Sequence, residues 1–360
     1  MAAGYDPSPL LMSEPLPQLL TFMGAPGSPY TRKMRALLRY RRIPYRFLIS
    51  GAGGREDLPA AKVRLLPTFY LPNAEGEIEA VVDSTPLIRR FEAEFDGRSV
   101  VPPDPVTAFI DYLLEDFGDE WLTKAMFHYR WVYEADIEKA GQILPRWRQV
   151  EGPEEQFQQA AKTVSERQIS RLWVVGSNET TGPVIEASYR RILELFRDHL
   201  TERQFLMGNR PGASDFAFFG QLTQLAAFDP TPMAVTLEVA PRVYAWVDRV
   251  EDLSGLEPTG DDWIGRELPA TLRALLGEVG RVYAPFLIAN ARALASGAES
   301  VECEIDGRPW VQKPFPYQGK CLMWLRERYE ELTAQDRSAV DGLLDGTGCE
   351  ILFGGAGAPS

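Results

Sequence analysis

The feature that most constrains this chain is a short apolar run that ends in a turn and gives way directly to a helix. Residues 19–23, Leu-Leu-Thr-Phe-Met, predict a buried strand. The next four residues, Gly-Ala-Pro-Gly, break that strand. Apolar residues then recur at helical spacing at Met34, Leu37 and Leu38. Ser28 therefore stands where a strand ends and a helix begins, and Pro29 suits the first position of that helix.

The local pattern around Ser28 allows two interpretations of this residue. Serine is a preferred N-cap, so Ser28 can be a purely structural start signal. The N–H groups of a first helical turn have no partners inside the helix, and the helix dipole favours negative charge there. The same hydroxyl would therefore lie in a field that stabilises a nearby thiolate or other anion. The sequence around Ser28 leaves both roles open.

The first hundred residues predict a small mixed α/β domain. A helix at 29–42 connects the strand at 19–23 to a strand at 44–49, which makes a βαβ unit with parallel strands. Pro67 suits the entrance of a strand, where a cis peptide bond is also admitted. Asp83 and Ser84 are good caps for the helix that follows them. The remaining elements expected here are a weak helix at 56–64, strands at 65–71 and 78–82, and a helix at 85–95.

The chain after the proline-rich linker at 102–105 predicts helices almost throughout. The expected helices lie near 109–131, 154–173, 183–200, 214–228, 240–251 and 263–297. The helix near 214–228 is very apolar and hence buried, and Asp215 near its start should bind backbone N–H groups. Two short strands flanking Asp306-Gly307 predict a hairpin, and helices near 320–333 and 335–344 close the chain.

These patterns divide the chain into four parts: a loose tail at 1–17, an α/β domain at 18–102, an all-helical domain at 103–298, and an extension at 299–360. Sixty residues form only a marginal core by themselves. We therefore expect the extension to pack on the helical domain. Its expected anchors are Trp310, Phe315, Tyr317 and Trp324.

The charge of the chain argues against a polyanionic partner. Lys and Arg number 38 against 51 Asp and Glu, a net charge of −13, so nucleic acid or an anionic membrane is not expected to bind. Residues 18–102 differ, because their 13 Lys and Arg exceed their 9 Asp and Glu. A mildly basic small domain suits a small anionic ligand.

Few residues are available for metal or disulfide chemistry. Cys303, Cys321 and Cys349 form no close pair, so no disulfide framework or zinc cluster is expected, and a reducing compartment is the simplest setting. His128 and His199 are the only histidines, which leaves little material for a metal site or a Ser-His-Asp triad. No bilayer-spanning run or signal peptide is evident, so a cytoplasmic protein is expected.

Four motifs in chain order resemble those of one family. Pro26-Gly27-Ser28 before the first helix is similar to the serine motif of delta- and theta-like glutathione S-transferases. Leu66-Pro67 resembles the pair at that family's cis-proline, and Asp83-Ser84 resembles its acidic-serine pair. The stretch Gly208 to Asp215 resembles the capping-box motif of its helical domain. The resemblance covers about residues 18–255 and implies a thioredoxin-like domain followed by an all-α domain, the glutathione S-transferase fold.

The resemblance also implies a mechanism. Ser28 would donate a hydrogen bond to the glutathione sulfur and, with the helix dipole, favour the thiolate. Leu66 and Pro67 would bind the cysteinyl part of glutathione, and Asp83 and Ser84 its γ-glutamyl end. The thiolate would attack a small hydrophobic electrophile in a pocket lined by helices near 109–131 and 214–228. Glutathione is then the co-substrate, no metal is needed, and the family suggests a homodimer with a role in detoxification.

Several alternatives stay open at this point. A non-catalytic binding or assembly protein of the same fold is favoured by the unplaced extension at 299–360, and a glutathione-dependent lyase or dehalogenase would share the site. Tyr30 competes with Ser28 as the donor to the sulfur. Arg32, Lys33 or Arg55 could meet a glutathione carboxylate, although a solvated basic face is the better explanation for any one of them. Gly212 replaces the Ser or Thr that usually begins the family's capping box.

Overall fold

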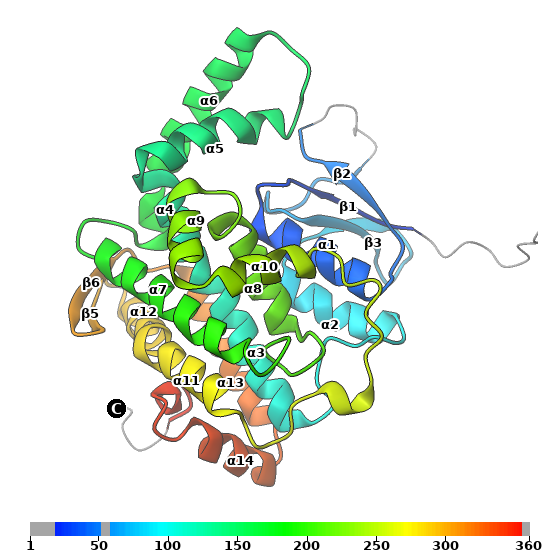
Figure 1. The fold of residues 1–360 in the computed structure, drawn as a ribbon, viewed down its shortest axis with the longest axis vertical. Helices are drawn as coiled ribbons and strands as arrows, with labels where there is room; N and C mark the ends of the chain where they lie inside the picture. The colour runs from blue at the N-terminus through cyan, green and yellow to red at the C-terminus, as the bar shows by residue number, and fades with distance from the viewer. Residues whose placement is uncertain (1–18, 52–57, 355–360) are drawn as a thin grey trace, which may run out of the picture.

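The computed structural model describes residues 19–51 and 58–354, and the expected tail at 1–17 lies outside them. Its first part is a four-stranded sheet in the order β2-β1-β3-β4 (Figure 1). β1 (Leu20–Gly24) runs parallel to β2 (Tyr45–Ile49) and antiparallel to β3 (Thr68–Pro72), which pairs with β4 (Ile78–Val81). The predicted parallel pair is therefore confirmed.

Two helices complete this part, α1 (Pro29–Tyr40) and α2 (Ser84–Glu94). The apolar face predicted for α1 is fully buried, since Met34, Leu37 and Leu38 have no exposed surface. Phe22 of β1 stacks on Phe69 of β3 with ring centroids 4.7 Å apart, which joins the strands beneath the helices. The weak helix expected at 56–64 is wrong for residues 58–64, which form bends and coil, while residues 56 and 57 lie outside the described chain.

The helical part begins at Asp104, whose side chain accepts hydrogen bonds from the N–H groups of Val106 and Thr107. Its first half contains α3 (Pro105–Glu120), α4 (Leu122–Val132), α5 (Glu134–Arg146), α6 (Glu154–Ile169), η1 (Leu172–Val175) and α7 (Gly182–His199). The single helix expected at 109–131 is thus two helices that meet at Trp121. Figure 1 shows α5 and α6 projecting away from the rest of the helical part.

The second half of the helical part contains α8 (Ala213–Leu225), α9 (Pro230–Val239), α10 (Pro241–Val250), η2 (Gly260–Asp262), α11 (Ala270–Glu278), η3 (Val279–Tyr283) and α12 (Ala284–Ser296). The helix expected at 263–297 starts only at Ala270, and the π-helical turn η3 lies within it. α5 and α9 were not expected, although Asp229-Pro230 is a start signal for α9. No helix among the described residues is long and apolar enough to span a membrane.

α8 is buried along its whole length, and two aspartates bind the groups at its start. Asp215 accepts hydrogen bonds from the N–H groups of Leu206 and Gly212, at 2.8 and 2.9 Å, as predicted. Asp111 of α3 accepts from the N–H groups of Ala213 and Ser214, at 3.3 and 3.0 Å. A Cβ atom at Gly212 would collide with the Asp111 carboxylate. Glycine at this position therefore admits a cap supplied by another helix.

The last sixty residues form the predicted hairpin and two helices. β5 (Val301–Ile305) and β6 (Arg308–Gln312) pair around Asp306-Gly307, and α13 (Pro316–Glu331), α14 (Ala334–Leu344) and η4 (Cys349–Leu352) follow. Trp310 of β6 is fully buried, with its ring against those of Trp121 and Phe286. α13 packs on α3 and α12, and α14 packs on α3 and α11. The hairpin and α13 together cover one side of the helical part.

Candidate functional site

A cavity of about 420 Å³ lies where the α/β part, α3 and α13 meet. Its walls come from the loop before β3, the start of α2, the end of α3 and one face of α13. Leu66, Pro67, Asp83 and Ser84, all expected at the glutathione site, line it together. The peptide bond between Leu66 and Pro67 is cis. The structure thus brings two of the four family-like motifs to one cavity.

Ser28 lies behind this cavity and is not among its lining residues. It is the N-cap of α1, and its hydroxyl accepts a hydrogen bond from the Thr31 N–H at 3.2 Å. The same hydroxyl donates to the Leu66 carbonyl at 3.4 Å. Ser28 therefore does act as a cap, and it contacts the cavity wall through Leu66.

The start of α2 places Asp83 and Ser84 at the cavity. Asp83 is the N-cap of α2, with a left-handed φ of 84°, and its Oδ1 accepts from the Thr85 N–H at 3.3 Å. Its Oδ2 accepts a hydrogen bond from the Tyr317 hydroxyl of α13 at 2.9 Å. Burial raises the pKa of Asp83, while Tyr317 and the Lys33 ammonium lower it. The extension is therefore bonded to the residue expected to hold the γ-glutamyl end.

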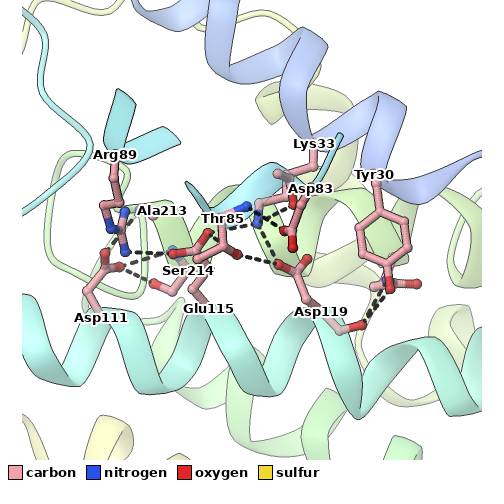
Figure 2. Close-up of polar contacts among 12 residues, drawn as sticks. Tyr30, Lys33, Asp83, Thr85, Arg89, Asp111, Glu115, Asp119, Ala213 and Ser214 are labelled. Carbon is pink, nitrogen blue, oxygen red and sulfur yellow. Dashed lines mark hydrogen bonds and ion pairs between the residues drawn. The ribbon is translucent and has the colours of Figure 1, made fainter. Parts of the chain in front are cut away.

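Lys33 is buried behind the cavity and does not form the solvated basic face considered above. Its ammonium donates to Glu115 at 2.8 Å, to Asp119 at 2.5 Å and to the Ser84 hydroxyl at 3.2 Å (Figure 2). Burial alone lowers the pKa of Lys33, but Asp119 and Glu115 outweigh burial and raise it. Arg89 also donates to Glu115, at 2.7 Å. Lys33 thus ties α1 to α2 and α3.

The other basic residues considered for a glutathione carboxylate lie elsewhere or cannot be placed. Arg32 pairs with Glu251 at 3.4 Å and donates to the Pro26 carbonyl. Arg55 lies outside the described residues. Tyr30, the rival donor, does line the cavity, but its hydroxyl donates to the backbone carbonyl of Asp119 at 2.9 Å (Figure 2). Burial and the nearby Glu120 raise the pKa of Tyr30 well above its ordinary value.

One face of α3 gives the cavity its acidic side. Tyr112, Asp116, Asp119 and Glu120 are spaced as neighbours on one helical face, and all four line the cavity. Burial raises the pKa of Asp116 to about 7, although its Oδ2 accepts from the Tyr283 hydroxyl at 2.6 Å. Burial and the neighbouring Asp116 raise the pKa of Glu120 to about 8. This spacing is a sequence signal that the motif-based prediction did not use.

α13 supplies the wall that was expected from the helix near 214–228. Tyr317, Gln318, Cys321 and Trp324 of α13 line the cavity, whereas α8 packs on α1 and α3 and contributes no lining residue. Gln318 donates to Glu120 at 3.3 Å. Burial and the carboxyl groups of Asp116 and Glu120 raise the pKa of the Cys321 thiol well above its ordinary value. Cys321 is therefore poorly suited to act as a thiolate.

A second polar constellation lies on the far side of α4. The ring of His128 contacts the Ser177 hydroxyl at 2.8 Å and the Glu186 carboxylate at 3.0 Å. These are the three residue types of a Ser-His-acid catalytic triad. Ser177 is only 5% exposed and His128 only 3%. The buried hydroxyl has no open approach for a substrate, so we interpret the group as structural. No group of three or more His, Cys, Asp or Glu within 19–51 and 58–354 is arranged to hold a metal ion.

Two family models match the chain in the order of its parts. The model described as glutathione S-transferase, N-terminal domain, matches residues 22–99. The model described as glutathione S-transferase, C-terminal domain, matches residues 155–249. Between them lies α3 with its acidic face, and beyond them lies α13. No curated protein matches the chain.

The solved structures that the chain matches include three glutathione S-transferase family members. One, from Methylobacterium radiotolerans in complex with glutathione sulfonate, is 16% identical, covers 67% of this chain and 99% of its own, and has a TM-score of 0.34. A Tau class enzyme from mango, Mangifera indica, is 18% identical over 68% of this chain and 93% of its own, with a TM-score of 0.36. A Pseudomonas fluorescens family member with bound glutathione is 18% identical over 67% and 100%, with a TM-score of 0.35.

Proposed function

The chain belongs to the glutathione S-transferase superfamily, and from that premise we propose that it is a glutathione-dependent transferase. The observation that carries the proposal is the meeting of Leu66, Pro67, Asp83 and Ser84 in one cavity, with Ser28 bonded to its wall. The reaction joins the glutathione sulfur to the carbon of a small electrophile. The electrophile's leaving group departs with the electron pair of the broken bond, and the thiol proton passes to solvent.

The start of α2 suits the γ-glutamyl end of glutathione. A helix N-terminus presents N–H groups and a positive dipole end, which bind a carboxylate, and the Ser84 hydroxyl lies there. The Asp83 carboxylate is a partner for the α-ammonium group. In this proposal the Leu66 backbone, beside the Ser28 hydroxyl, binds the cysteinyl residue. In this arrangement the sulfur lies toward α1.

Ser28 can serve as cap and as donor at the same time. The Ser28 oxygen accepts a hydrogen bond from the Thr31 N–H. The same hydroxyl donates its proton to the Leu66 carbonyl in a long hydrogen bond, with 3.4 Å between the two oxygen atoms. A small rotation of the hydroxyl moves that proton to a thiolate sulfur without removing the cap. The hydrogen bond and the dipole of α1 both favour the thiolate over the thiol. We therefore assign thiol activation to Ser28.

A titration with glutathione tests the proposal directly. Calorimetry on the full chain should detect binding, and Asp83→Asn should weaken it because the carboxylate partner of the ammonium is lost. A panel of small electrophiles with glutathione should then identify conjugation, and the same panel distinguishes a lyase or a dehalogenase by the products released. Absence of both heat and thermal shift at millimolar glutathione would defeat the proposal.

One observation favours the second candidate, a non-catalytic binding or assembly protein. The Tyr317 hydroxyl of the extension already donates to Oδ2 of Asp83, the carboxylate that is expected to bind the glutathione ammonium. A chain that uses its extension to fill this site would bind little glutathione. The calorimetric titration separates the two candidates. Whether the chain forms a homodimer is tested by light scattering on the same sample.

A further inference from the structure

The acidic side of the cavity has no cationic side chain of its own. Asp116, Asp119 and Glu120 line it, and no Lys or Arg does so among the residues that the structure describes. Lys33 lies nearest, but its ammonium already contacts two carboxylates and the Ser84 hydroxyl. Lys124 follows on α4 and donates to the Val175 carbonyl and the Gln312 amide oxygen. Of the three carboxyl groups of this wall, only that of Asp119 contacts an ammonium group of the described chain, which is that of Lys33 behind the cavity.

Two side chains of this wall keep buried oxygen atoms without a donor. Asp119 is 6% exposed, and its Oδ1 has no hydrogen-bond partner in the described chain. Gln318 is 3% exposed, and its Oε1 likewise lacks a partner there. Burying an acceptor without a hydrogen bond costs free energy, so each of these atoms needs a donor from water or from a ligand. Both residues line the same cavity, on facing helices.

Aromatic side chains of α3 and from the start of α13 onward also line the cavity, and together they form its aromatic wall. Tyr112, Phe315 and Trp324 line it together with Tyr317. A ligand cation is attracted both by the faces of aromatic rings and by carboxylates, and the two attractions strengthen when water is excluded. Glutathione itself offers one ammonium group, for which Asp83 is the expected partner. The surplus acceptors on α3 and α13 are thus left for a second ligand of the cavity.

We propose that the second substrate of this site is an organic cation, whose ammonium or amidinium group is held by Glu120, Asp119 and Gln318 while its apolar part lies against the aromatic wall. This inference rests on the proposed transferase function and narrows its electrophile from any small hydrophobic compound to a positively charged one. A neutral isostere leaves the acceptors unpaired and binds more weakly.

Proton release follows from the surroundings of Glu120. The titratable groups around it are Asp116, Asp119, Lys124, Tyr30, Tyr283, Tyr317 and Cys321. Burial raises the pKa of Glu120 to about 8, so in the empty cavity this carboxyl holds a proton at neutral pH. A bound cation favours the ionised form and lowers that pKa. Binding of a cation should thus release protons, whereas a neutral compound should release none.

Calorimetry with two matched probes on the full chain tests the inference. The probes are 2-phenylethylammonium and the neutral 2-phenylethanol, each titrated with and without saturating glutathione in buffers of different ionisation enthalpy. We expect the ammonium probe to bind about tenfold or more tightly than the alcohol, with proton release. Glu120→Gln should remove most of this preference. Glu304→Gln, an exposed glutamate on the β5–β6 hairpin, should keep it.

Each other result overturns the inference. Equal binding of the two probes, or no binding of the ammonium probe, shows that the wall does not select a cation. Competition between the ammonium probe and glutathione shows that the only cation site is the one for glutathione's own amine. The comparison of probes on the unaltered chain stands even if Glu120→Gln does not fold. Failure to bind glutathione defeats the proposed function separately, because the probes are also titrated without it.

Discussion

The hydroxyl of Tyr317 donates a 2.9 Å hydrogen bond to Oδ2 of Asp83, across 234 positions of the chain. Asp83 caps the first helix after the sheet, and Tyr317 stands in the first turn of α13. The contact joins the C-terminal extension to the element expected to hold the γ-glutamyl end of glutathione. Through this contact the C-terminal extension forms part of the cavity wall.

Tyr317→Phe should raise the affinity for glutathione by about threefold to tenfold, because the ammonium group no longer competes with one neutral hydrogen bond. Calorimetry measures this change. Tyr329→Phe is the matched control, since Tyr329 of the same helix donates to Asp341 at 2.6 Å on the exposed side. Weaker binding in Tyr317→Phe would instead mean that the hydroxyl contacts the ligand.

Ser28→Ala should lower turnover with a small electrophile by about one to three powers of ten, the range for loss of a positioned donor. Glutathione affinity should change much less, and the pKa of the bound thiol, read from thiolate absorbance, should rise. Loss of the cap alone would lower the melting temperature and cost about 1 kcal/mol of stability, leaving the thiol pKa unchanged.

Tyr30→Phe is the control for this assignment. The Tyr30 hydroxyl already donates to the Asp119 carbonyl. We therefore expect Tyr30→Phe to change the stability of the fold more than the pKa of the glutathione thiol. Unchanged turnover in Ser28→Ala together with a strong loss in Tyr30→Phe would transfer the role to the tyrosine.

Asp111 and Gly212 should show strong coupling in a double-mutant cycle. Gly212→Ser alone should destabilise the fold, because its Cβ collides with the Asp111 carboxylate. Asp111→Ala alone should cost about 1 to 3 kcal/mol, since the N–H and the hydroxyl of Ser214 lose their acceptor, whereas the Ala213 N–H keeps the Val100 carbonyl. The double variant restores a serine cap and removes the collision with the carboxylate, so that only the flexible Met207 side chain has to move. Urea unfolding should therefore give a smaller loss than the sum. Simple additivity would contradict this account of α8.

The stability of the chain should decrease with rising pH in a way that depends on Glu120. Its pKa is raised from 4.5 to about 8, so the folded chain binds this proton more tightly than the unfolded chain. The stabilisation of the folded chain by this proton is complete below pH 4.5. It decreases as the pH rises toward 8, by up to about 1.4 kcal/mol per pH unit. Urea unfolding of Glu120→Gln across this interval should give a flatter profile. Glu304→Gln should follow the unaltered chain.

Cys321 should react slowly with alkylating reagents at neutral pH, although it lines the cavity. Its thiol is 2% exposed, and burial with Asp116 and Glu120 raises its pKa well above the ordinary value. Mass spectrometry of the labelled native chain measures the rate, and the unfolded chain provides the comparison. Rapid labelling of the native chain would show that the Cys321 thiol is activated.

We also expect no dithiol exchange at the start of α1, because residues 28–31 contain no cysteine.

The parts of the structure that the sequence predicted well are those that local signals specify. The strand at 19–23, its turn and the start of α1 follow from apolar spacing, Ser28 and Pro29, and β1 and α1 begin within one residue of the prediction. The β5–β6 hairpin follows from Asp306-Gly307, which both adopt a left-handed φ. Where such signals are weak, as at 58–64 and 263–269, the expected helices are absent.

What only the tertiary structure decided is which distant side chains meet. Lys33 looked like one more surface base, and its burial between Glu115 and Asp119 depends on how α1 docks on α3. The missing capping residue at Gly212 was visible in the sequence, but its replacement by Asp111, 102 positions before the Ala213 N–H that it accepts from, was not.

The same holds for the acidic and aromatic walls of the cavity. The spacing of Asp116 and Glu120 shows that they share a helical face, yet no local sequence signal predicts which element packs against that face. Gln318 and Tyr317 reach it because the hairpin and α13 fold back over α3 and α12. Local propensities determine where helices and strands begin. Partners far apart in the chain are instead selected by which apolar faces can be buried together, and this depends on the whole fold.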